Sequence, residues 1–174
     1  MTVPPHLRKA LLTAHVATSV GWFGAVLAYL ALDVTAVTGQ DVATVRGVYA
    51  AMDVVVRYAV VPLALASVLI GVVTAVAGPW GLFRHYWVLL KLLLTVVAAA
   101  VLLVEAQTVG DLAASAATAA DPRELPGTLP HSVGGLVVLF LALVLSVFKP
   151  RGVTRYGWRR QVERRRGQRT RTTG

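Results

Sequence analysis

Four apolar runs, each long enough to cross a bilayer, occupy most of this chain of 174 residues. A transmembrane helix needs about 20 mainly apolar residues to span about 30 Å of hydrocarbon. The runs therefore predict transmembrane helices at residues 7–32, 54–77, 86–108 and 132–148. Hydrophobic residues make up 56% of the chain and charged residues only 14%, which leaves too little polar surface for a water-soluble domain. We expect an all-α integral membrane bundle formed by residues 1–148.

Basic residues are distributed unequally between the predicted loops. Arg8 and Lys9 precede the first span, Arg84 lies in the second loop, and ten of the seventeen basic residues follow Phe148. The first and third loops carry mostly acidic residues instead. Because basic loops stay in the cytoplasm, this pattern predicts that both termini are cytoplasmic. Alanine, valine, leucine and arginine dominate over lysine and isoleucine, which indicates a bacterial gene and hence a bacterial plasma membrane.

The tail after the last span, residues 149–174, accounts for the net charge of +9. We expect a disordered cytoplasmic segment that lies near anionic lipid headgroups, an attraction worth about 1 kcal/mol per basic residue close to the surface. Clustered arginines also neutralise the phosphates of nucleic acids. No folded reader of bases accompanies them here, so the sequence disfavours nucleic-acid binding.

Lys91 lies inside the third predicted span, between apolar residues on both sides. A lysine at the centre of a transmembrane helix costs about 2.5–3.5 kcal/mol on insertion scales. Either the ammonium extends to the headgroups, since Lys91 is close to the predicted cytoplasmic end of the span, or it is buried with a functional role. The sequence leaves both readings open, and it makes Lys91 a candidate catalytic residue.

His15 lies in the first predicted span, on a relatively polar stripe at helical spacing. The stripe consists of His15, Thr18, Ser19, Trp22, Ala25 and Tyr29. Such a stripe should face other helices and not lipid. Gly21 and Gly24 would let a neighbouring helix approach closely. A neutral histidine in this place either hydrogen-bonds another helix or binds a metal ion.

A second group of ionisable residues lies near the predicted outer ends of the spans. It consists of Asp33, Asp53, Arg57, Glu105 and His131. Arg57 and Glu105 each lie inside an apolar run and would be costly alone, which predicts an ion pair between them. The alternative is a metal or proton entry site in which His131 acts with one of the carboxylates.

Two short motifs resemble those of the HemJ-type membrane protoporphyrinogen oxidases. In the first span six residues separate His15 from Trp22-Phe23, and in the third span Trp87-x-x-x-Lys91-Leu is similar to that family's lysine motif. The HemJ family shares a small helical membrane fold with the copper-resistance protein D family. The chain is also similar to a group of bacterial predicted integral membrane proteins of unknown function.

The resemblance implies a haem-dependent membrane oxidoreductase. His15 would be an axial ligand of haem b, Trp22 would lie beside the cofactor, and Lys91 would pair with a propionate or with the carboxylate of a substrate. A porphyrin or a quinone would be the redox partner. The chain departs from the HemJ pattern where it reads Tyr29-Leu-Ala-Leu-Asp33 in place of a Pro-Arg pair. Where that family has a histidine soon after the lysine, this chain has only Val101 and Leu102 nearby.

Two other classes of function stay open beside haem binding. One is a non-catalytic membrane partner, for which His15 and Lys91 would matter only to stability. The other is a small transport component for protons or metal ions. A single copy with four spans and no internal repeat is small for a complete transport path, so this function would need a homo-oligomer.

Overall fold

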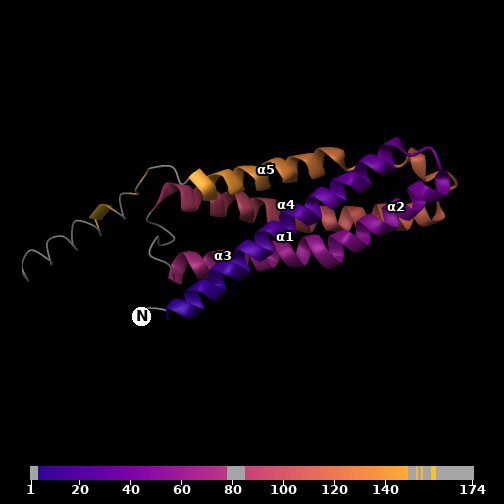
Figure 1. The fold of residues 1–174 in the computed structure, drawn as a ribbon. Helices are drawn as coiled ribbons and strands as arrows, with labels where there is room; N and C mark the ends of the chain where they lie inside the picture. The colour runs from indigo at the N-terminus through magenta and orange to yellow at the C-terminus, as the bar shows by residue number, and fades with distance from the viewer. Residues whose placement is uncertain (1–3, 78–84, 149–151, 153, 155–157, 160–174) are drawn as a thin grey trace, which may run out of the picture.

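The computed structural model describes residues 4–77, 85–148, 152, 154, 158 and 159. Its helices lie side by side in one elongated bundle, and α1 begins at the end of the bundle where α5 finishes (Figure 1). Their bounds are α1 Pro5–Thr38, α2 Val42–Val55, η1 Val56–Val60, α3 Val61–Ala77, α4 Tyr86–Thr118, η2 Pro122–Glu124 and α5 Leu129–Phe148. Within the described residues, four continuous helical segments are long and apolar enough to cross a membrane. The predicted all-α fold with four such helices is confirmed, while most of the tail after residue 148 lies outside the described residues.

The helices extend well beyond the apolar runs that predicted them. α1 has 34 residues, which corresponds to about 50 Å against about 30 Å of hydrocarbon. The expected long loop at residues 33–53 is replaced by the short turn of residues 39–41, and α4 continues to Thr118 where a loop was expected. The hydropathy of the sequence shows only where the apolar side chains end, and not where the helix ends. The backbone hydrogen bonds of a helix continue into polar surroundings beyond that point.

Local sequence explains the tight turn between α1 and α2. The Asp41 carboxylate caps α2 by accepting hydrogen bonds from the Thr44 backbone N–H and hydroxyl, each at 2.7 Å. Gly39 lies where the two helices are closest: a Cβ there would be 2.7 Å from both the Thr35 carbonyl oxygen and Val45 Cγ2. Only glycine permits this approach without a shift of the backbone.

A π-helical turn, η1, connects α2 and α3 into one continuous span. Pro62 follows this turn; it has no backbone N–H, and its ring would clash with the carbonyl of Tyr58 in a regular α-helix. A wider turn removes this conflict. Such π-turns are frequent at functional sites, and the Val56 and Val60 side chains of η1 are buried inside the bundle.

The core of the bundle forms around one face of α1. Its buried residues recur every three or four positions, at Trp22, Val26, Tyr29, Asp33 and Ala36. α1 contacts α2, α3 and α5, and α4 contacts the same three helices from the other side. The stripe predicted on the first span does face protein, since none of its members is exposed. A neighbouring helix comes close to α1 at Gly21, where a Cβ would lie 3.3 Å from Leu63, and not at Gly24.

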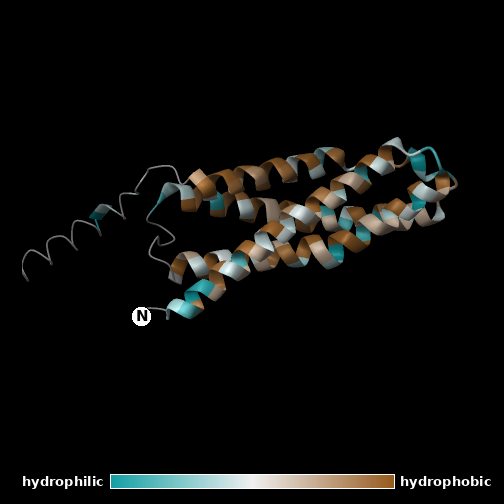
Figure 2. Cartoon of the chain, in the orientation of Figure 1, coloured by the Kyte–Doolittle hydropathy of each residue, from teal (hydrophilic) through white to brown (hydrophobic). Residues whose placement is uncertain are grey.

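We call the end of the bundle that contains residues 39–41 and 119–128 the distal end. Hydrophilic residues gather there, while apolar residues dominate the middle of the bundle (Figure 2). Arg46 of α2 donates hydrogen bonds of 2.6, 2.7 and 2.9 Å to carbonyl oxygens at the end of α4. These oxygens belong to Ala116, Ala117 and Ala119. Arg123 donates to the Gln40 carbonyl oxygen at 2.9 Å. This bond holds residues 119–128, which we call the distal loop, to the α1–α2 turn.

Candidate functional site

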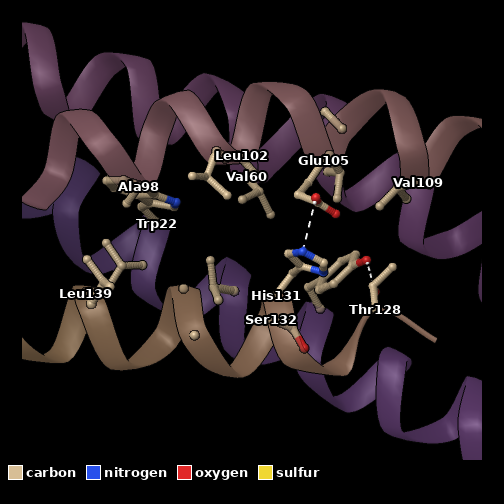
Figure 3. Close-up of a pocket in the computed structure, with 18 of the residues that line it drawn as sticks. Trp22, Val60, Ala98, Leu102, Glu105, Val109, Thr128, His131, Ser132 and Leu139 are labelled. Atoms are coloured by element: carbon tan, nitrogen blue, oxygen red, sulfur yellow. Dashed lines mark hydrogen bonds and ion pairs between the residues drawn. The ribbon is translucent and has the colours of Figure 1, made fainter.

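A cavity of about 280 Å³ lies between α1, η1, α4 and α5. Trp22 and Leu139 line one end of it, and Glu105, His131 and Thr128 line the other (Figure 3). Nearly all of the remaining wall is apolar. Apolar cavities with a few polar groups at one end are typical of sites for small molecules, and the cores of helical bundles commonly hold them.

Small residues on α5 keep this space open. Gly134 and Gly135 both line the cavity, and a Cβ built on either one would meet no atom within 4 Å. Ala98 and Ala106 line it from α4. The apolar helix α5 therefore contributes no side-chain volume to the cavity wall at these two positions.

Glu105 and His131 form the polar end of the cavity, from α4 and the first turn of α5. The His131 Nε2 atom lies 3.4 Å from Glu105 Oε1, with side-chain exposures of 56% and 21%. Hydrogen bonds of the N–H···O type are usually 2.7–3.2 Å long, so this contact is loose. Glu105 accepts no other hydrogen bond from the described residues. Its carboxylate thus keeps acceptor capacity toward the cavity.

Asp33 anchors the wall behind this polar end. Its side chain is fully buried, and its two oxygens accept hydrogen bonds from the Thr128 backbone N–H at 3.1 Å and the Ser132 hydroxyl at 2.7 Å. The Tyr29 and Thr128 hydroxyls are hydrogen-bonded at 2.7 Å. This network joins α1 to the first turn of α5. Asp33 was expected at the membrane edge of its span, but it lies inside a longer helix.

The structure forms two other pairs in place of the predicted one between Arg57 and Glu105. Arg57 Nε donates to Asp53 Oδ1 at 2.6 Å, one helical turn away, and its side chain is 56% exposed. Residues four apart lie on the same helix face, which favours this local pair. The guanidinium lies over Gly110 of α4, nearer the distal end than Glu105, whose partner is His131.

The His15 side chain is partly buried against α3. Its Nδ1 atom is buried and makes no hydrogen bond within the described residues. The ring packs closely on Gly71, where a Cβ would lie 2.8 Å from the imidazole Cε1. His15 and Lys91 are close enough for their charges to interact, and no ion pair among the described residues includes Lys91. Neither residue lines the cavity, although Trp22 does.

The carboxylates expected around His131 mostly have other partners. Asp33 is bound by Thr128 and Ser132, and Asp53 is paired with Arg57, so only Glu105 contacts the imidazole. Across residues 4–77 and 85–148, no three histidine or carboxylate side chains converge in a way that could hold a metal ion.

Thr128 and Ser132 contribute to the site although the sequence did not single them out. Thr128 precedes the first residue of α5, and its carbonyl oxygen accepts the backbone hydrogen bonds of His131 and Ser132. A hydroxyl residue directly before an apolar run is a helix N-terminal signal. That signal could have placed Thr128 at the start of α5, but it could not have paired it with Asp33.

The chain gave no match to a protein-family model, to a curated protein or to a solved structure.

Proposed function

We propose that this protein binds a small amphiphilic molecule of the bilayer in the cavity between α1, α4 and α5. One observation carries the proposal: polar groups of Glu105, His131 and Tyr29 gather at one end of a cavity that is otherwise apolar. Such a site orients a molecule with its polar group at the distal end and its apolar body beside Trp22. Quinones, which the HemJ resemblance implies as partners, belong to this chemical class.

The proposal includes a location in a bacterial plasma membrane with both termini in the cytoplasm. The support is the excess of basic residues at the amino end and in the tail, against the acidic distal loop. A green fluorescent protein fused after Gly174 is expected to fluoresce, and alkaline phosphatase inserted at Gly127 is expected to be active. The opposite pair of results would reverse the orientation.

Trp22 provides a direct test of the cavity because it forms part of the wall. The chain contains four tryptophans, and replacing Trp80, Trp87 and Trp158 by phenylalanine leaves Trp22 as the only one. An ω-bromoalkyl alcohol is the probe, since bromine quenches indole fluorescence on contact. We expect quenching of Trp22 that saturates with probe concentration, with the hydroxyl at Glu105 and His131 and the bromine at the apolar end.

A matched pair of variants decides whether the quenching reports the cavity. Gly135→Leu places a side chain into the open space and is expected to abolish the saturable quenching. Gly47→Leu adds the same side chain to an exposed position of α2 that has equal room and does not line the cavity, and it is expected to change nothing. Equal, non-saturating quenching in both variants would refute the proposal.

Haem binding at His15 is a second candidate function, favoured by the buried Nδ1 atom that has no hydrogen-bond partner within the described residues. An imidazole nitrogen without another partner suits an axial ligand. The ring packs directly on Gly71 of α3 and does not line the cavity, so α1 and α3 would have to separate for haem iron to reach Nδ1. The nearby Lys91 ammonium would pair with a propionate. Bound haem would supply one-electron redox chemistry.

Visible absorption spectra of the purified protein, oxidised and then reduced with dithionite, test the haem candidate. A Soret band is expected in the wild type and in His6→Ala, which alters an exposed histidine of the same helix. His15→Ala is expected to lose the band while keeping its thermal stability. Absence of a band in the wild type after haem supplementation would contradict this candidate and leave the cavity proposal intact.

A further inference from the structure

The charge of the cavity's polar end limits which amphiphiles it can hold. Among the described residues that line the cavity, Glu105 is a carboxylate and none is lysine or arginine. Asp33 lies directly behind the wall, bound to Thr128 and Ser132. His131 alone could carry a positive charge there, and it makes only a loose contact with Glu105. An anionic headgroup would meet two carboxylates at this end, a costly juxtaposition.

The cavity also presents aromatic surfaces to a ligand. Trp22 and Tyr29 are 3% and 7% exposed to solvent, and both line the cavity. The faces of such rings attract cations, with the strongest effect where water is excluded. Tyr29, which is hydrogen-bonded to Thr128, lies at the same end of the cavity as Glu105. Trp22 lines the opposite end (Figure 3). A carboxylate with spare acceptor capacity beside one buried aromatic ring is a combination suited to an organic cation.

From these contacts we infer that the cavity selects amphiphiles with a cationic head, an alkylammonium in chemical class, over neutral and anionic ones. This inference rests on the proposed function of the cavity. The cation would lie against Glu105, within reach of the Tyr29 ring, while its apolar body occupies the space beside Trp22 and Gly135. His131 shares the Glu105 carboxylate at 3.4 Å and would turn away as the ligand head enters.

Three probes with one bromoalkyl chain separate the effect of charge from that of the cavity. They are the ω-bromoalkyl alcohol, the corresponding trimethylammonium and the corresponding carboxylate. Dissociation constants come from quenching of the Trp22-only protein in uncharged detergent. We expect the ammonium to bind at least about tenfold more tightly than the carboxylate, with the alcohol between them.

Glu105→Gln tests whether this carboxylate is the source of the selectivity. In that variant the ratio of ammonium to carboxylate affinity is expected to fall to about threefold or less, because the carboxylate that contacts the ligand head is removed and the shape is kept, while Asp33 stays behind the wall. Glu124→Gln makes the same change at an exposed position that does not line the cavity, and it is expected to preserve the ratio. A ratio that survives Glu105→Gln would overturn the inference.

The probes also distinguish failure of this inference from failure of the proposed function. If the alcohol binds saturably and the ammonium binds no more tightly than the carboxylate, charge selection is refuted and the cavity function stands. If none of the three probes quenches Trp22 saturably, both are refuted.

Discussion

Replacing Asp33 by alanine is expected to lower the free energy of unfolding by about 1.5–4.5 kcal/mol. The buried carboxylate accepts hydrogen bonds from the Thr128 N–H and the Ser132 hydroxyl. Its removal leaves the buried Thr128 N–H without a partner, at a cost of about 1–3 kcal/mol. The Ser132 hydroxyl keeps the Leu129 carbonyl oxygen as an acceptor at 3.1 Å and loses one hydrogen bond, worth about 0.5–1.5 kcal/mol. Unfolding by sodium dodecyl sulfate in mixed micelles, followed by circular dichroism, measures the loss. Hydrogen exchange of the Thr128 N–H should become faster in the same variant.

Two further substitutions separate the hydrogen bonds from other effects of charge. Asp33→Asn keeps the shape and one acceptor oxygen, so about half of the loss is expected. Asp111→Ala removes an exposed carboxylate of α4 and should change the free energy by no more than about 0.5 kcal/mol. If Asp33→Ala unfolds at the same detergent fraction as the wild type, this network does not hold α5 to α1.

Arg46→Ala is expected to cost about 1.5–3 kcal/mol and to loosen the end of α4. The guanidinium donates to the carbonyl oxygens of Ala116, Ala117 and Ala119, which have no later helical N–H groups to bind. Hydrogen bonds to a charged group contribute about 1.5–3 kcal/mol, and a cation at the carboxyl end of a helix also interacts well with its dipole. The same detergent titration measures the change.

Arg46→Lys shows whether geometry or charge is responsible. A lysine keeps the charge, but its compact ammonium cannot reach all of these oxygens as the planar guanidinium does. We expect it to recover only part of the lost stability. Arg8→Ala, at an exposed position in the first turns of α1, should be close to neutral. Equal stability of Arg46→Ala and the wild type would show that the distal end is held by other contacts.

The membrane-spanning helices could be predicted from the sequence because their cause is local. A bilayer offers no hydrogen-bond partner to a bare backbone, so an apolar run of sufficient length must form a helix. The same local rule marked His15, Lys91 and Glu105 as costly. The sequence also contained signals at helix ends, such as Asp41 before α2. The apolar runs did not indicate how far α1 and α4 continue beyond the predicted spans.

The tertiary structure decided which of these residues meet. Partners depend on how each helix is rotated and shifted against its neighbours, and small-residue packing sets this over long distances in the sequence. Gly71 brings α3 against His15, Gly110 leaves room for the Arg57 guanidinium, and Gly134 and Gly135 leave the cavity open. Glu105 therefore meets His131, Asp33 meets Thr128, and Trp22 becomes part of a cavity wall. Hydropathy carries no information about helix rotation, so the four helices were determined by the sequence alone and the site between them only by their packing.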